Sequence, residues 1–279
     1  MRVVVTGGSG LVGSYVVEEL AASHEVTILD LVEPEKSGVG FVRADILWLS
    51  QVVDAIRGQD AIVHLAAIPH PLNDPPQRVF EVNVMGTFNV LQAAHEEGVR
   101  RVVFASSDST LGLCFGAPDR VPHYLPIDEC HPLEPEDPYG LSKLIGEEIC
   151  RAYARLGPMS VVALRPAWVW TKEEKEELKP LVEDPAKWVF GLWAYVDARD
   201  LARAFRLALE ADGLPPFDVF LISADDNGTR EESIELVRRY LPAVKDIRRQ
   251  LRGRESLIDT AKAKRMLGFA PRYTWRDIL

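Results

Sequence analysis

The first fourteen residues, MRVVVTGGSGLVGS, constrain the fold more than any other stretch of the chain. Arg2–Thr6 is rich in β-branched apolar residues, which is typical of a buried strand, and residues 11–20 carry apolar side chains at helical spacing. Between them, Gly7, Gly10 and Gly13 permit a tight turn, a close approach of the backbone to a pyrophosphate, and close packing of helix on strand. The first N–H groups of the helix would then face the phosphates. The stretch therefore predicts a dinucleotide-binding site.

An acidic residue at the expected spacing supports this prediction. Residues 24–29 form a second predicted strand, and Asp30 ends it, 20 residues after Gly10. A carboxylate there accepts hydrogen bonds from the adenosine ribose hydroxyls and repels a 2′-phosphate, so it favours NAD over NADP. We therefore predict NAD as the cofactor, and Asp30 argues against the alternative of an NADP-dependent carbonyl reductase.

Charge and cysteine usage exclude several classes of protein. The 279 residues carry a formal net charge of −10, whereas nucleic acids and anionic membranes attract basic surfaces. No apolar run approaches the roughly 20 residues that span a bilayer. The first strand begins at the N-terminus, so we expect no signal peptide and a cytoplasmic location. The cysteines, Cys114, Cys130 and Cys150, are too few and too scattered for a disulfide framework, and we expect no metal site.

Strands and helices alternate through the first half of the chain. Further strands are predicted at residues 41–43, 61–65, 99–105 and 160–164, and helices at residues 47–57, 75–97 and 137–156. This alternation predicts an α/β fold, a Rossmann-type doubly wound parallel sheet with helices on both faces.

The pattern loosens after residue 164. The charged run at residues 172–179 indicates a solvated helical face, and residues 191–196 look extended. Asp197 is a candidate cap for a helix at 197–211, Thr229 and Glu232 form a capping-box pattern for a helix at 229–240, and Gly268 follows a short helix at 259–267. Phe217–Ile222 is a predicted strand. We expect residues 1–166, with 194–211 returning to them, to form an NAD-binding domain, and 167–279 to form mainly a small C-terminal substrate-binding lobe.

Two places in the middle of the chain carry side chains suited to proton transfer. Tyr139 and Lys143 stand four residues apart near the start of a predicted helix, so they share one face. A nearby ammonium favours the phenolate and lowers the tyrosine pKa. The strand at 99–105 ends in a serine pair, and the hydroxyl of Ser107 could hold a substrate oxygen against Tyr139.

With these residues in view, the chain resembles the extended short-chain dehydrogenase/reductase family, in the branch of NAD-dependent sugar epimerases and dehydratases. Ordered blocks along nearly the whole chain carry the resemblance: TGGSGLVG, HLAA at 64–67, EVNVMGTFNVLQAA, FASSDSTLG at 104–112, YGLSK at 139–143, LRP at 164–166, AYVDARDLA at 194–202 and the terminal RMLGFAPRYTW. The resemblance implies an NAD-dependent enzyme acting on a sugar or nucleotide-sugar. It also suggests a homodimer formed through the helices at 75–97 and 137–156.

The resemblance also implies roles for individual residues. Tyr139 would be the catalytic acid/base, Lys143 would bind the nicotinamide ribose and lower the Tyr139 pKa, and Ser107 would be the catalytic serine. The implied cofactor contacts are Gly7, Gly10, Leu11, Val12, Gly13, Asp30, Asp45, Ile46, Leu65, Ala66, Ala67, Tyr139, Lys143 and Pro166. The implied substrate contacts are Ser107, Asp108, Tyr139 and Trp168. Asn83 is expected to be structural.

Departures from the family pattern leave the reaction open between epimerase and dehydrogenase. Asn-x-Tyr-Gly-Pro often follows the Arg-Pro of the family, whereas AWVWT stands here, and the C-terminal lobe is short, so a free sugar or uronic acid is an alternative substrate. Dehydration is less favoured because Ser109, not glutamate, follows Asp108. A uronic acid is less favoured because no arginine that could bind its carboxylate follows closely after Pro166. The nearest cations, Lys172 and Lys175, are expected at the surface. A non-catalytic dinucleotide sensor is the remaining alternative.

Other aromatic and imidazole side chains have two interpretations. Trp168, Trp170 and Trp193 could stack on a sugar ring or could fill the interior of the lobe. His70 and His123 lie beside prolines in predicted loops and are expected to face solvent rather than substrate.

Overall fold

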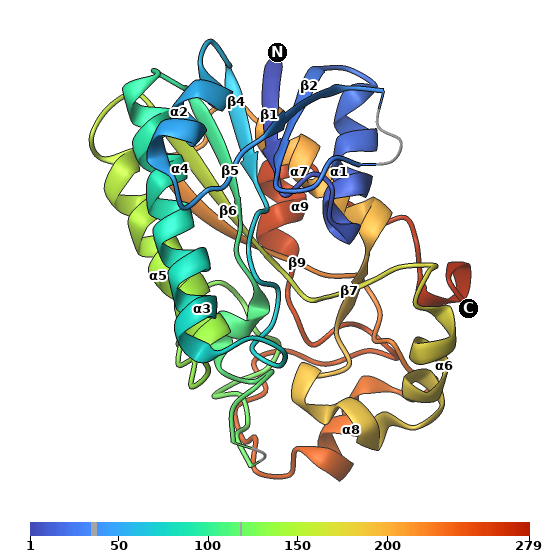
Figure 1. The fold of residues 1–279 in the computed structure, drawn as a ribbon. Coiled ribbons are helices and arrows are strands. Elements are labelled where there is room, and N and C mark those ends of the chain that lie inside the picture. The colour runs from blue at the N-terminus through green and yellow to red at the C-terminus, as the bar shows by residue number, and fades with distance from the viewer. Residues whose placement is uncertain (35–37, 118) are drawn as a thin grey trace.

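The computed structural model describes residues 1–34, 38–117 and 119–279, and its centre is a seven-stranded parallel sheet (Figure 1). The strands are β1 (Arg2–Thr6), β2 (Glu25–Asp30), β3 (Gly40–Arg43), β4 (Ala61–His64), β5 (Arg101–Ala105), β6 (Ser160–Pro166) and β9 (Phe217–Ile222). Their order is β3-β2-β1-β4-β5-β6-β9. This confirms the Rossmann-type fold and places the topological switch point between β1 and β4, where such sheets bind ligands beyond the carboxyl ends of the strands.

Helices cover both faces of the sheet. The helices are α1 (Leu11–Ala21), α7 (Ala198–Glu210) and α9 (Ala261–Leu267) on one face, and α2 (Leu49–Ile56), α4 (Gly86–Glu96) and α5 (Pro138–Ala154) on the other (Figure 1). Successive residues of β1 alternate between them, because Val3 and Val5 belong to one buried cluster and Val4 to the other. The nearly continuous apolar sequence of β1 follows from this burial on both sides.

The helix predicted at 75–97 is continuous but changes its winding. It consists of α3 (Pro76–Phe80), a π-helical segment η1 (Glu81–Met85) and α4. Asn83 lies in this segment, and its side chain bonds both the N–H (2.8 Å) and the carbonyl oxygen (3.0 Å) of Ile68 in the segment after β4. The structural role expected of Asn83 therefore has a physical basis in these bonds.

The second half of the chain both completes the sheet and builds a separate core. β9 is the last strand of the large sheet and α9 packs against it, whereas β7 (Trp168–Trp170) and β8 (Tyr195–Asp197) form a two-stranded parallel sheet of their own. The remaining elements of this half are α6 (Lys175–Glu183), the 3-10 segment η3 (Pro185–Gly191), α8 (Ser233–Tyr240) and η4 (Trp275–Asp277). In the described chain, no helix is long and apolar enough to cross a membrane.

Two local predictions for this half were wrong. The helix predicted at 229–240 begins at Ser233, because the Thr229 hydroxyl bonds Asn227 Oδ1 (2.9 Å) and the N–H of Glu231 (3.1 Å) instead of capping a helix. The extended stretch predicted at 191–196 is extended only from Tyr195, since Leu192 and Trp193 adopt left-handed conformations with φ of 53° and 55°. The helical face predicted for the charged run at 172–179 is present from Lys175 onward, in α6.

Candidate active site

The glycine turn after β1 has the geometry that a pyrophosphate requires. Gly7 adopts φ +74°, and a Cβ atom on it would lie 2.7 Å from the backbone nitrogen of Ala66. A Cβ atom on Gly13 would lie 2.1 Å from the Gly7 carbonyl oxygen, so α1 can approach the turn only without a side chain there. Gly10 begins α1 with no side-chain cap. The uncapped start of α1, at Leu11, Val12 and Gly13, therefore fits the phosphates of a dinucleotide.

Asp30 is fixed beside this turn at the end of β2. Its Oδ2 atom accepts a hydrogen bond from the N–H of Ser9 (3.0 Å), and Oδ1 accepts one from the N–H of Leu31 (2.7 Å). These bonds hold the carboxylate at the position where a ribose hydroxyl would meet it.

Asp45 and Ile46 follow β3 on the same edge. The Asp45 carboxylate accepts the N–H of Leu47 (2.9 Å) and is half-buried. The Ile46 side chain packs into the core against Gly86, where a Cβ atom would come within 2.3 Å of its Cδ1. Ile46 therefore presents mainly backbone to the cofactor side of the sheet.

The end of β4 is held by hydrogen bonds that the sequence did not reveal. His64 is buried, with Nδ1 2.7 Å from Thr6 Oγ1 and Nε2 3.1 Å from Thr87 Oγ1. The Thr87 hydroxyl donates to the Asn83 carbonyl oxygen (2.6 Å), so Nε2 must carry the imidazole proton. Burial, followed by the nearby Lys143 charge, lowers the pKa of His64 to about 3, which keeps the ring neutral.

This arrangement places the next residues against the glycine turn. The N–H of Leu65 donates to the Thr6 carbonyl oxygen (3.0 Å), and the N–H of Ala66 donates to Thr6 Oγ1 (3.2 Å). Leu65, Ala66 and Ala67 are half-buried and lie beside Gly7 across the switch point. The predicted cofactor residues of β1 and β4 thus come together.

Tyr139 and Lys143 stand one turn apart on α5, as the spacing predicted. The Asp137 carboxylate caps this helix by accepting the N–H groups of Tyr139 and Gly140, each at 2.9 Å. The Lys143 ammonium donates to the carbonyl oxygen of Ala105 (2.8 Å), at the end of β5, and lies 5.6 Å from the centroid of the Tyr139 ring. The three predicted catalytic residues, Ser107, Tyr139 and Lys143, are all buried at this edge of the sheet.

The Ser107 hydroxyl lies among polar partners. It is 3.0 Å from Ser109 Oγ and 3.3 Å from Asp108 Oδ1, and the Cys114 thiol is 3.6 Å from the same carboxylate oxygen. Asp108 Oδ2 has no hydrogen-bond partner in the described part of the chain and is not sealed from solvent. Asp108 therefore has one oxygen engaged with the serine and one free for a ligand.

Burial shifts the pKa values of these groups. It raises the pKa of Asp108 to about 6 and also raises that of Tyr139, although the Ser107 hydroxyl favours the phenolate. It lowers the pKa of Lys143 to about 8. Clustered shifts of this size are typical of catalytic sites.

The tryptophans divide between the surface and the core of the lobe. Trp168, two residues after Pro166, is 39% exposed, whereas Trp170 and Trp193 are fully buried. The Trp168 ring packs edge-on against Trp170 and against Trp188, with centroids 6.3 and 6.0 Å apart. Trp170 and Trp193 thus fill the lobe, and of the three only Trp168 is exposed.

Several residues named from the sequence lie away from these groups, and one near them was missed. His123 is exposed and pairs with Glu134 (3.1 Å), as expected for a surface loop, and Lys172 is exposed. His70 is half-buried. The missed residue is Phe115, whose ring packs edge-on against Tyr139 at a centroid distance of 6.3 Å. Periodicity carries no signal for a loop side chain of this kind.

Comparison with known proteins identifies the relatives of this chain. Residues 3–223 match the NAD dependent epimerase/dehydratase family. L-arabinose 1-dehydrogenase (NAD(P)(+)) of Haloferax volcanii is 35% identical over 233 residues, which cover 81% of this chain and 89% of the relative. UDP-glucose 4-epimerase of Corynebacterium glutamicum is 27% identical over 310 residues, with 98% and 92% covered.

Solved structures agree with this assignment. A short-chain dehydrogenase/reductase superfamily protein from Agrobacterium tumefaciens with bound NAD superposes with a TM-score of 0.76 and 28% identity, covering 100% of this chain and 95% of the other. MoeE5 in complex with UDP-glucose and NAD gives a TM-score of 0.75 and 25% identity, with 99% and 95% covered.

Proposed function

This chain belongs to the NAD-dependent epimerase/dehydratase family of extended short-chain dehydrogenases/reductases, and from that premise we propose that it oxidises a free aldose at its anomeric hydroxyl. Membership makes it an NAD-dependent sugar oxidoreductase or isomerase. The observation that carries the proposal is that Ser107, Tyr139 and Lys143 are buried together at the edge of the sheet where the glycine turn also lies. These groups supply proton transfer at a hydroxyl carbon placed against a nicotinamide.

Two observations favour a free aldose over a nucleotide-sugar. The dehydrogenase relative acts on L-arabinose and is covered over 89% of its length, whereas the alignment with the UDP-glucose epimerase runs over 310 positions and so exceeds the 279 residues of this chain. The epimerase therefore has extra segments. In addition, the half-exposed indole of Trp168 stands just after Pro166, and an aromatic face is suited to the C–H face of a sugar ring.

The roles we propose follow the geometry of the site. Tyr139, as the phenolate, accepts the proton of the sugar hydroxyl, and the Lys143 ammonium beside its ring favours that phenolate. The Ser107 hydroxyl donates to the reacting oxygen, and Asp108 Oδ2 accepts a neighbouring sugar hydroxyl. Bound NAD would supply the acceptor for the hydride that leaves the anomeric carbon bearing that hydroxyl.

The cofactor contacts remain those predicted from the sequence. We propose that the glycine turn and the start of α1 hold the pyrophosphate, that Asp30 holds the adenosine ribose, and that Asp45 and Ile46 flank the adenine. On the nicotinamide side we propose Leu65, Ala66, Ala67 and Pro166, with Lys143 on the ribose. The domain division into residues 1–166 with 194–211, and mainly 167–279, is likewise a proposal, in which β9 and α9 contribute to the sheet.

The test is NADH absorbance at 340 nm with NAD and a panel of aldoses, uronic acids and UDP-sugars. Sustained NADH release with an aldose supports the proposal. Conversion of a UDP-sugar to its epimer without net NADH would assign epimerisation instead. Tyr139→Phe should lower kcat by about 100- to 10,000-fold, as loss of general acid–base catalysis does. Tyr153→Phe is the matched control, because its hydroxyl lies on the same helix but bonds Gln92 (2.6 Å).

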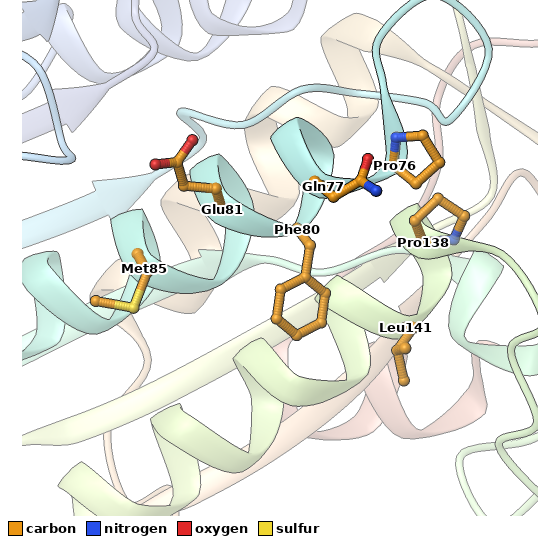
Figure 2. Close-up of a pocket in the computed structure, with 7 residues that line it drawn as sticks. All are labelled: Pro76, Gln77, Phe80, Glu81, Met85, Pro138 and Leu141. Atoms are coloured by element: carbon orange, nitrogen blue, oxygen red, sulfur yellow. The ribbon is translucent and has the colours of Figure 1, made fainter.

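We also propose that the protein is a homodimer formed by α3, η1 and α5. A hollow of about 520 Å³ between these helices is lined by Phe80, Met85 and Leu141, which are 39%, 48% and 40% exposed (Figure 2). An exposed apolar strip shared by adjacent helices matches the self-complementary surface of a twofold dimer. Light scattering after size exclusion should give twice the 31.1 kDa chain mass, and Leu141→Glu should give the chain mass.

A cytoplasmic location belongs to the same proposal. Cys114, Cys130 and Cys150 are all free thiols, as is usual in a reducing compartment.

A further inference from the structure

A buried ion pair lies directly beneath the proposed catalytic residues. The Arg165 guanidinium donates from Nε to Glu147 Oε1 (2.7 Å) and from Nη2 to Glu147 Oε2 (2.6 Å). The two side chains are only 4% and 1% exposed. The Ser106 hydroxyl donates to the same carboxylate (2.5 Å). Three polar side chains far apart in the sequence are thus joined inside the protein.

Each member of this cluster adjoins one part of the site. Glu147 follows Lys143 by one turn of α5, Ser106 directly precedes Ser107, and Arg165 directly precedes Pro166. The cluster therefore connects the helix that carries the tyrosine and lysine with the ends of β5 and β6.

Close packing of α5 against β5 brings these side chains within hydrogen-bonding distance. Ser106 follows β5 directly, where its N–H bonds the Phe104 carbonyl oxygen (3.1 Å) and its hydroxyl turns toward Glu147 of α5. The Phe104 ring lies against Gly146, where a Cβ atom would come within 2.6 Å of it. The helix consequently lies close enough to β5 for Glu147 to reach Ser106 and for Lys143 to reach the Ala105 carbonyl oxygen.

Stability alone explains this cluster poorly. A buried ion pair must overcome the desolvation of both charges, and well-packed apolar residues in its place are often neutral or stabilising. Arg165 Nη1 is also buried without a hydrogen-bond partner in the described part of the chain, which adds a further cost. The directional bonds of the cluster fix relative positions, which apolar packing does less strictly.

We propose that Ser106, Glu147 and Arg165 are positioning residues that set the distance between α5 and the ends of β5 and β6, and so the alignment of Tyr139, Lys143 and Ser107. The inference rests on the proposed function, because the alignment of these residues is measured through the rate of the proposed reaction. The three residues act through their neighbours and do not touch the substrate.

The first test removes one bond and leaves the ion pair in place. Ser106→Ala should lower kcat about tenfold while the KM for the sugar stays within twofold and the urea midpoint of unfolding stays near that of the wild type. A kcat within twofold of wild type would overturn the proposal.

The second test separates position from stability. Glu147→Leu/Arg165→Met replaces both charges by apolar groups, so the urea midpoint should be close to that of the wild type, while kcat falls by 100-fold or more. The control is Glu19→Leu/Arg206→Met, which removes an ion pair (2.7 Å) between α1 and α7 on the opposite face of the sheet and should leave kcat unchanged. A stable, fully active Glu147→Leu/Arg165→Met protein would refute the proposal, and if that protein does not fold, Ser106→Ala decides.

Failure of the proposed function can be told apart from failure of this inference. If the wild-type protein oxidises no sugar, the proposed function fails, and the positioning role is then read from NADH fluorescence titration. Glu147→Leu/Arg165→Met should weaken NADH binding at least fivefold through the displaced Lys143, and unchanged binding would overturn the inference.

Discussion

The sheet half of the molecule and its C-terminal lobe bury their interiors in different ways. In the sheet, alternate residues of each strand enter one of two cores, and the backbone conformation decides which residue goes where. In the lobe, large aromatic side chains, among them Trp170, Trp188, Trp193 and Tyr195, pack against short elements and irregular turns. From this difference we propose a division of labour, in which backbone groups of the sheet half hold the cofactor and side chains near the lobe select the sugar.

Substitutions in the glycine turn should give the largest effect, which we expect in NADH binding. Gly13→Ala places a methyl group 2.1 Å from the Gly7 carbonyl oxygen, so α1 must move away from β1, and NADH binding should be lost. Gly10→Ala meets only the Gly7 carbonyl oxygen at 3.3 Å and should fold normally, yet it adds a methyl group to the turn that we propose holds the pyrophosphate. We expect a cost of about 1–3 kcal/mol in NADH binding, roughly 5- to 150-fold.

Fluorescence titration with NADH measures both variants. The control is Gly157→Ala, at a position with no neighbouring atom within 4 Å, which should bind NADH normally. Normal NADH binding by Gly13→Ala would break the assignment of the cofactor to this half.

The buried Asp108 carboxylate should lower the free energy of unfolding at neutral pH. Because one pKa unit corresponds to about 1.4 kcal/mol, the rise of its pKa from 3.8 to about 6 destabilises the folded state by about 3 kcal/mol at pH 7. The folded protein binds this proton more tightly than the unfolded chain, so this contribution to stability falls as the pH rises from about 4 to 6. Asp108→Asn should therefore raise the free energy of unfolding at pH 7 and lose that advantage below pH 4.

Urea unfolding at pH 4, 5.5 and 7 checks this prediction. Asp54→Asn, whose carboxylate is 71% exposed, should show no comparable pH-dependent gain. If Asp108→Asn were destabilised at pH 7, that result would contradict the raised pKa of the buried Asp108 carboxylate.

Trp168 should give a smaller effect, confined to the sugar. If the indole stacks on the ring, Trp168→Ala removes an aromatic contact of about 0.5–1.5 kcal/mol, so KM for the aldose should rise roughly 2- to 10-fold while NADH binding is unchanged. Trp48→Ala is the matched control, since Trp48 is 62% exposed at the start of α2. Weaker NADH binding by Trp168→Ala would contradict the proposed division, because it would show that Trp168 also contributes to cofactor binding.

The same division explains what the sequence could predict. The succession of strands along the chain, the glycine turn, the position of Asp30 after β2 and the Tyr139–Lys143 spacing depend on local periodicity and spacing, and the structure places them as predicted. The His64 hydrogen bonds and the Glu147–Arg165 pair depend on contacts between residues far apart in the chain, for which one sequence carries no local signal. In the lobe, left-handed turns at Leu192 and Trp193 and a buried Thr229 overrode the local pattern.

The smallest effect tests this last point. A capping box at Thr229 and Glu232 would make either side chain worth about 1 kcal/mol to the helix. In the structure, Glu232 precedes α8 with no side-chain hydrogen bond to it, whereas the buried Thr229 hydroxyl bridges Asn227 and Glu231. Glu232→Ala should therefore change the free energy of unfolding by less than about 0.5 kcal/mol, as surface substitutions usually do.

Thr229→Val should instead cost about 1–3 kcal/mol, because it leaves buried polar groups of the turn without their partner. Thr229→Ser retains the hydroxyl and should recover most of the loss. Urea unfolding of the three variants decides between the two descriptions. Equal losses in the free energy of unfolding for Glu232→Ala and Thr229→Val would support the capping box instead. They would mean that the local sequence pattern determines the structure of the lobe as closely as that of the sheet.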